Sequence, residues 1–291
     1  DITADDYYKL YVNGTYVGQG PAQGYHFHYY YNRYDLSNYL KPGHNTIAVH
    51  VFYHGMVNRA YNSSDHRQGV IAELIDAEGK VILGTDDTWK TKQTLMYGGA
   101  SVPVATAHRT QYIEQIDARS ELREWNRSEY DDTDWEPACV KTEVDYQFAL
   151  QPTPVVDVYR QVPAVVEKRG KDRYWIDFGQ EITGAFTMRA QGRPGEEILI
   201  LHGEELWEET DAVRAKLRCD CDYRDRWTLS GDVDVLEPFD YKGFRYVEVH
   251  GAEAAVDPDS FAALVRHYPY PEEASHFASG DERLERIWQL C

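Results

Sequence analysis

The sequence predicts a mainly β protein with two consecutive antiparallel β-sandwich or jelly-roll domains, followed by the first part of a helix. Short segments in which apolar and polar residues alternate recur along the chain, as expected for half-buried strands. Turn residues separate these segments, and no helical pattern lies between them. The length of 291 residues suits about two domains.

The first predicted domain, residues 1–150, opens with the strongest hairpin signal in the chain. Asn13-Gly14 separates the β-rich segments 9–12 and 15–17, and this dipeptide favours a type I′ turn with positive φ at both positions. Further strands are expected at 47–53, 70–75 and 80–83.

The second predicted domain, residues 151–271, begins where Pro152 and Pro154 interrupt the strand pattern. Its strands are expected at 174–178, 185–188, 197–201, 226–229, 245–249 and 261–265, separated by frequent glycines. Pro269-Tyr270-Pro271 then reads as a short stiff linker.

The last segment, residues 272–291, predicts a helix. Ser279 and Glu282 have the spacing of a capping box. They precede an apolar stripe at helical spacing, made of Leu284, Ile287, Trp288 and Cys291. A single helix of about a dozen residues is marginal alone. We therefore expect a helical domain to follow.

Charge and composition narrow the range of partners. The formal net charge of −19, with no basic stripe, argues against nucleic acid as a partner. No run of 18 apolar residues predicts a membrane span. The four cysteines do not make a disulfide framework, and Cys219-x-Cys221 reads as two adjacent thiols rather than half of a metal site. We expect no metal and no cofactor.

Four sequence motifs follow one another along the chain. They are Asp117-Ala118-Arg119 with Trp125 and the segment Tyr130–Trp135, then Asp177-Phe178-Gly179-Gln180 with Gly184, then Glu237–Val249, and finally Ser279–Trp288. This set resembles the bacterial α-L-rhamnosidases, whose accessory β domains precede a catalytic (α/α) barrel. Glu181 departs from the small amide that often follows the glutamine in that family.

The resemblance implies that the chain is the accessory part of a glycoside hydrolase that removes terminal α-L-rhamnose with inversion. The general acid and base of that family are carboxylates of the barrel, so we expect no catalytic residue in this chain. The implied partners are a rhamnose-containing glycan or glycoside and the missing catalytic domain of the same protein. The alternative is a free-standing carbohydrate-binding or adhesion module, which would not be expected to end on an uncovered apolar stripe.

The localisation stays open. The few cysteines would fit a bacterial cytoplasmic protein, but Asp1 leads directly into a strand pattern, so the sequence shows no targeting segment to read.

The candidate carbohydrate-binding residues lie in one long non-periodic loop that follows a strong strand. Its polar and aromatic side chains suit hydroxyl recognition and ring stacking, and those we select are Tyr53, Tyr61, Asn62, Asp65 and Arg67. The alternative is that this loop packs against the missing barrel.

Two other clusters have a simpler interpretation. The acidic segment Glu204–Asp211 has carboxylates spaced for a paired site around Trp207, but such charge runs are usually solvated turns. The aromatic stretch Tyr25–Tyr34 would offer stacking surfaces, yet alternate rings of a strand commonly fill a core. His26 and His28 within it read as packing histidines.

Overall fold

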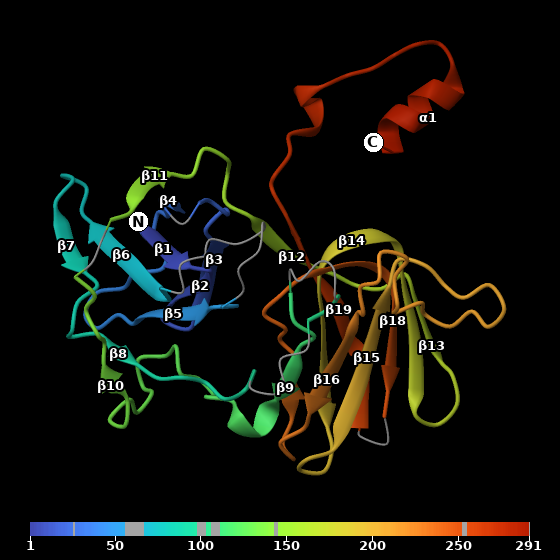
Figure 1. Ribbon diagram of the computed structural model, residues 1–291, viewed down its shortest axis with the longest axis horizontal. Helices are drawn as coiled ribbons and strands as arrows, with labels where there is room; N and C mark the ends of the chain where they lie inside the picture. The colour runs from blue at the N-terminus through green and yellow to red at the C-terminus, as the bar shows by residue number, and fades with distance from the viewer. Residues whose placement is uncertain are drawn as a thin grey trace.

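The computed structural model describes residues 1–25, 27–55, 67–97, 103–105, 111–142, 145–251 and 255–290. These residues form a mainly β protein, as the sequence predicts, with a group of small sheets on one side and a large curved sheet on the other (Figure 1).

The N-terminal part contains two antiparallel three-stranded sheets. One has the order β1 (Ile2–Asp5), β6 (Gly69–Ile75), β7 (Val81–Gly84), and the other has the order β3 (Thr15–Gly20), β2 (Tyr7–Val12), β5 (Ile47–Phe52). Alternate residues of β1 and β2 form a small core of Ile2, Ala4, Tyr8 and Leu10 between them.

Two short pairs extend this part. Strand β4 (His28–Tyr31) pairs in parallel with β11 (Gln147–Leu150), and β8 (Lys90–Thr91) pairs with β10 (Glu136–Pro137).

The turn between β2 and β3 is the predicted hairpin. Val12 pairs with Thr15, and φ is 52° at Asn13 and 80° at Gly14, as a type I′ turn requires. The side chain of Asn13 adds a second restraint, because its Nδ2 donates to Tyr39 O and to Asn45 Oδ1.

The chain then crosses to the second part through a segment that is tied down. The Gln151 side-chain oxygen accepts from the Ala22 N–H and from Asn32 Nδ2, each at 2.7 Å, and Gln151 Nε2 donates to Pro154 O. The proline-rich segment is therefore anchored to the N-terminal sheets at its first residue.

The second part is one nine-stranded sheet. Its main path runs β12 (Asp157–Gln161), β19 (Ala255–His267), β14 (Arg173–Gln191), β18 (Lys242–His250), β15 (Glu197–Gly203), β16 (Arg224–Thr228), β9 (Gln115–Asp117). Strands β13 (Val165–Lys168) and β17 (Asp234–Val235) also pair with β14. The strands of this sheet pair in antiparallel fashion, except that β9 is parallel to β16. Because β9 lies in the first half of the chain, residues that precede the second part complete this sheet.

Strand β14 corrects one expectation. The sequence predicted two strands, at 174–178 and 185–188, but the structure has one strand of 19 residues with a register shift between Asp177 and Ile182. Asp177 holds this bulge because its carboxylate accepts from the Gly179 N–H at 2.7 Å and from Arg245 on β18 at 2.8 Å. Gly179, which the sequence places between the two expected strands, lies inside the one strand. Its φ of 79° allows the backbone to form the bulge.

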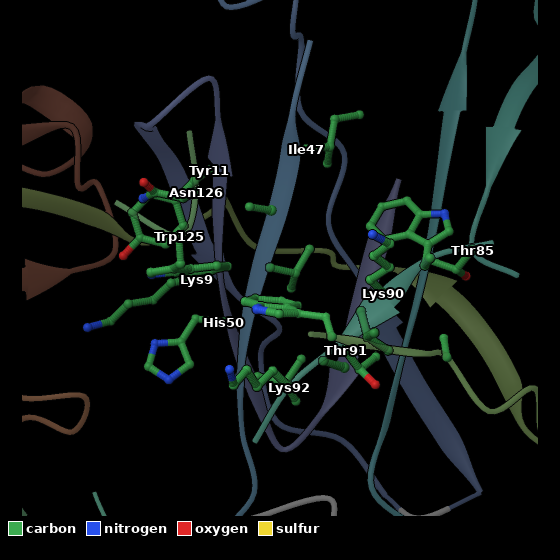
Figure 2. A pocket seen from close by; sticks show the side chains of 18 of the residues that line it. Lys9, Tyr11, Ile47, His50, Thr85, Lys90, Thr91, Lys92, Trp125 and Asn126 are labelled. Carbon is green, nitrogen blue, oxygen red and sulfur yellow. The ribbon is translucent and has the colours of Figure 1, made fainter. Parts of the chain in front are cut away.

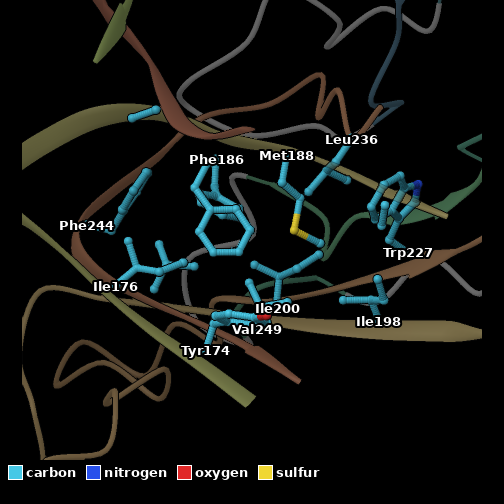
Figure 3. Close-up of a cluster of buried hydrophobic side chains, with 14 of the residues drawn as sticks. Tyr174, Ile176, Phe186, Met188, Ile198, Ile200, Trp227, Leu236, Phe244 and Val249 are labelled. Carbon is cyan, nitrogen blue, oxygen red and sulfur yellow. The ribbon is translucent and has the colours of Figure 1, made fainter. Parts of the chain in front are cut away.

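The main core lies within the curved second sheet (Figure 3). Its largest fully buried side chains include Trp227, Phe186, Phe244, Ile198 and Ile200. Ile116 of β9 is 1% exposed and belongs to the same cluster. The second sheet therefore does not close its core without residues that precede it in the sequence.

The last described helix is α1 (Glu282–Leu290), which Figure 1 shows away from the sheets of both parts. Two 3₁₀ turns, η1 (Ala118–Ser120) and η2 (Glu272–Ala274), lie earlier. The helix is confirmed, but its predicted cap is wrong. Asp281, not Ser279, caps it, because the Asp281 carboxylate accepts from the N–H groups of Arg283 and Leu284. Glu285, not Glu282, reaches back, to the N–H of Ser279 and of Gly280.

The apolar stripe of α1 is partly exposed, as expected: Leu284 is 47%, Ile287 50% and Trp288 43% exposed. Cys291 lies outside the described residues. In the described part of the chain, no helix has the length and apolar character needed to cross a membrane.

Candidate functional site

An open groove of about 1950 Å³ lies beside the sheets of the N-terminal part. Strand β5 contributes apolar side chains to it, including Ile47, Val49 and Val51. Figure 2 shows the polar and aromatic residues that surround this surface, among them Lys9, Tyr11, His50, Trp125, Asn126, Thr85, Lys90, Thr91 and Lys92. An apolar surface with a few polar groups is the usual composition of a small-molecule site.

Two of the predicted carbohydrate residues line this groove. Tyr53 follows β5, and Arg67 precedes β6, so the two ends of the predicted loop reach the groove from strands of the two different three-stranded sheets. Arg67 Nη1 donates to Asp145 Oδ1 at 2.8 Å, and its guanidinium lies 4.4 Å from the ring centroid of Tyr146. Tyr61, Asn62 and Asp65 lie outside the described residues.

Aromatic rings that the site prediction did not include gather around Trp125. Its ring centroid lies 5.7 Å from that of Tyr11 and 6.1 Å from that of His50, and it stacks on Trp135 at 6.4 Å. Tyr130 packs edge-on against Trp135. The sequence signal was present: three aromatic residues spaced five apart in a segment without helical or strand periodicity.

Two lysines of the groove are ion-paired, and its histidine is neutral. Lys90 Nζ lies 2.6 Å from Asp132 Oδ1, and Lys92 pairs with Asp134. Burial, with Lys9 adding to it, lowers the pKa of His50 to about 3. A neutral imidazole beside aromatic rings suits recognition of an uncharged, hydroxyl-rich ligand better than of an anion.

The aromatic stretch 25–34 divides between core and surface. Tyr29 is 3% exposed and packs against Tyr146 and Phe148. Tyr25 and Phe27 are exposed and stack face to face with an interplanar angle of 5°. The core interpretation therefore holds for Tyr29 and for Tyr34, which packs against the N-terminal core. His26 lies outside the described residues.

The acidic segment forms a surface turn rather than a paired site. Glu204, Glu208 and Glu209 are exposed. Glu205 binds Arg218 at 2.8 Å, and this hydrogen bond lowers the pKa of the Glu205 carboxyl. A carboxyl that is held ionised does not suit the role of a general acid.

A buried polar cluster joins the two parts of the molecule. His54 of the N-terminal part lies between two carboxylates, with Nδ1 3.2 Å from Asp6 Oδ2 and Nε2 3.2 Å from Asp240 Oδ2. Burial alone would lower the pKa of His54, but the hydrogen bonds to Asp240 and Asp6 outweigh it and raise the pKa to about 9. His54 is therefore an imidazolium that donates to one carboxylate from each part.

The same cluster continues around Lys242. Its Nζ lies 2.8 Å from Asp225 Oδ2, and Glu114 Oε1 accepts from the Phe239 N–H. Burial raises the pKa of Glu114 to about 7, although Lys242 opposes the shift. All of these side chains are buried, so the cluster serves to join the two parts rather than to meet a ligand. Among the described residues, no three His, Cys, Asp or Glu side chains gather as a metal site.

Comparison with known proteins accounts for nearly the whole chain. Residues 2–160 match the family described as the alpha-L-rhamnosidase N-terminal domain. Residues 167–267 match the family described as the bacterial alpha-L-rhamnosidase concanavalin-like domain.

Individual relatives agree with these matches. An alpha-L-rhamnosidase of Streptomyces avermitilis is 28% identical over 285 residues, which cover 92% of this chain and 27% of that protein. One from Formosa agariphila is 25% identical, with 94% and 30% covered. The chain thus spans less than a third of the length of these curated relatives.

The fold of this chain is similar to those of two solved structures. The alpha-L-rhamnosidase of Aspergillus terreus is 26% identical with a TM-score of 0.67, and the match covers 92% of this chain and 32% of that one. A rhamnosidase of Bacillus sp. GL1 gives a TM-score of 0.82 at 15% identity, covering 99% of this chain and 53% of that one. The second likeness concerns the fold alone.

Proposed function

Because the chain belongs to the bacterial α-L-rhamnosidase family, we propose that it is the accessory β portion of a glycoside hydrolase that removes terminal α-L-rhamnose with inversion. The observation that carries the proposal is the ordered pair of family matches, over residues 2–160 and 167–267. In this proposal the catalytic acid and base belong to an (α/α) domain outside this chain.

We further propose that this portion is organised as a jelly-roll domain at 1–150, a second β-sandwich domain at 151–271, and a linker with a helix at 272–291. Within the first range, β9 and Met96 extend into the second sheet and its core. The buried bridge from Asp6 through His54 to Asp240 would fix the first domain on the second. The orientation of the groove would then be constant relative to the second sheet.

The groove is the proposed carbohydrate contact of this portion. Tyr53 and Arg67 line it, and Tyr61, Asn62 and Asp65 belong to the loop that joins them. Arg67 would donate to sugar hydroxyls, while the tyrosines and the rings around Trp125 would stack on the apolar face of the sugar.

Titration calorimetry with L-rhamnose and a rhamnose-containing oligosaccharide tests the carbohydrate contact. If the groove binds sugar, Arg67→Met should weaken binding roughly 10- to 100-fold, because a hydrogen bond to a charged group is lost. Asn62→Ala and Asp65→Ala should weaken it as well. Arg193→Met is the matched control, since Arg193 is 81% exposed on a turn of the second sheet and does not line the groove.

A folded chain that gives no heat with either sugar, or variants that bind as tightly as the parent, would contradict the carbohydrate contact. The loop would then be assigned to packing against the catalytic domain.

A further inference from the structure

Cys219 and Cys221 stand apart from the groove, on a tight hairpin of the second part. Lys216 bridges to Asp222, the Leu217 N–H donates to Cys221 O at 2.8 Å, and the Asp220 N–H donates to Leu217 O at 3.1 Å. Only one residue separates the two cysteines, and that residue, Asp220, has a φ of 72°.

This local fold holds the two cysteines at the tip of the hairpin. The left-handed Asp220 turns the chain sharply between Cys219 and Cys221, and the backbone hydrogen bonds of Leu217 with Cys221 and Asp220 close the turn around them. A disulfide needs close Cα atoms, and two residues that flank a single turn residue meet this requirement through the short length of chain between them. Both thiols are free in the structure, with Cys219 exposed and Cys221 half-buried.

We propose that Cys219 and Cys221 form a reversible intramolecular disulfide by exchange with a low-molecular-weight disulfide. This site is separate from the proposed carbohydrate contact and does not depend on it. The hairpin also holds Arg214 and Arg218, which bind Glu205, so oxidation would stiffen the turn beside the acidic segment.

The exchange takes two balanced steps. The exposed Cys219 thiolate attacks one sulfur of the small disulfide RSSR, which forms a mixed disulfide and releases one RSH. The Cys221 thiolate then attacks Cys219 Sγ, which forms the internal disulfide and releases a second RSH. The protein loses two electrons and two protons, and RSSR gains them.

The order of attack follows from the surroundings. Burial, then the hydrogen bond to Cys219, raises the pKa of the Cys221 thiol to about 11, so Cys221 is the slower nucleophile in solution. Its attack is intramolecular over a very short loop, however, and this gives it a high effective concentration toward the mixed disulfide. The small ring should make the product easy to reduce.

Cys139 is the internal control. It is exposed and free, and it lies in the N-terminal part, away from the Cys219–Cys221 hairpin. A lone thiol of this kind should stop at the mixed disulfide.

The test is to incubate the folded chain, carrying Cys291→Ser, with oxidised glutathione and to follow its peptides by mass spectrometry. The peptide with residues 219–221 should lose two hydrogens and carry no glutathione, while the Cys139 peptide carries one glutathione. Both changes should reverse with dithiothreitol. Cys219→Ser and Cys221→Ser should each abolish the internal disulfide, and circular dichroism should confirm that both variants stay folded.

Two results would overturn the proposal. One is a stable glutathione adduct on Cys219 or Cys221 in the chain that keeps both thiols. The other is a 219–221 peptide that stays fully reduced under conditions in which Cys139 is modified.

Discussion

At the scale of single residues, the junction of the two parts depends on the charge of His54. Both ring nitrogens face carboxylates, and the imidazole ring is buried. Removing one partner of a buried ion pair leaves the other without compensation, which costs about 3–5 kcal/mol. His54 therefore gives the junction a dependence on pH that surface pairs would not give.

The sign of this dependence follows from the raised pKa. The folded pKa of His54 is about 9, against an unfolded value of 6.5. Its contribution is fully present below the unfolded pKa and is lost as the pH rises through 9. Urea unfolding should show a loss of about 2–3 kcal/mol between about pH 7 and about pH 10, and this slope should vanish in His54→Gln.

His44→Gln is the control for this measurement, because His44 is exposed. Tyrosines with raised pKa values add a slope near pH 10, but they do so equally in parent and variants. If the parent and the His54→Gln variant lose the same free energy of unfolding over this pH range, His54 is not charged in the folded protein.

Gly184 is a second residue whose role the structure defines. A Cβ added there would lie 2.3 Å from the backbone oxygen of Leu264, so strands β14 and β19 can meet at this point only over a glycine. Gly184→Ala should destabilise the second part by about 1–3 kcal/mol or more, as other overpacked positions do.

Denaturant unfolding followed by the fluorescence of the buried Trp227 would measure this effect. Gly69→Ala is the matched control, since Gly69 also lies in a strand but a Cβ there would meet nothing within 4 Å. Equal midpoints for the two variants would show that β19 moves aside without cost.

At the scale of elements, helix α1 contributes little to the two sheets. None of its described residues is buried, and Trp288 packs on Phe277 of the preceding segment with ring centroids 5.7 Å apart. Burying a large apolar side chain contributes about 1.5–3 kcal/mol. In this helix Leu284, Ile287 and Trp288 are about half exposed, and Leu290 is 84% exposed.

Trp288→Ser should therefore leave the thermal unfolding of the sheets almost unchanged. Trp227→Ser, at a fully buried position, should lower stability by about 3–5 kcal/mol or prevent folding. Differential scanning calorimetry of both variants makes the comparison. If Trp288→Ser lowers the Tm as much as Trp227→Ser does, the helix is a structural cap that stabilises the β part.

At the scale of the whole molecule, we predict that this chain does not hydrolyse glycosides by itself, because the proposed function places the catalytic acid and base in another domain. Inversion needs an acid and a base about 6.5–9.5 Å apart on either side of a water. One exposed pair of carboxylates is Glu181 with Glu204, whose Oε1 atoms lie 3.5 and 3.6 Å from the place where a Cβ on Gly243 would be. Burial, with Glu204 adding to it, raises the pKa of Glu181, but Glu204 is exposed on a surface turn.

An assay on an aryl α-L-rhamnoside checks this expectation. The parent chain, Glu204→Gln and Glu181→Gln should all give the rate of the buffer alone. Turnover by the parent that is lost in either variant would place a catalytic site on the second sheet and would overturn the accessory assignment.

The sequence by itself determined the β class, the Asn13-Gly14 hairpin, most strands of both parts and the terminal helix. These features depend on local chemistry, in which a period of two, a turn dipeptide or an apolar stripe acts over a few neighbouring residues. Tyr53 and Arg67 could be selected on the same basis, as polar and aromatic residues in a non-periodic loop after a strong strand.

Only the tertiary structure decided what joins residues far apart in the chain. Ile116 and Met96 pack in the core of the second sheet. The side chain that caps the backbone before α1 is Glu285 instead of Glu282. Asp177 stabilises a bulge that joins the two expected strands into one. The bridge between Asp6 and Asp240, and the rings around Trp125, likewise need separated segments to meet. The physical reason is that burial and hydrogen bonding act between residues that are close in space. Periodicity in the sequence describes only neighbouring residues, so it does not predict which distant residue completes a contact.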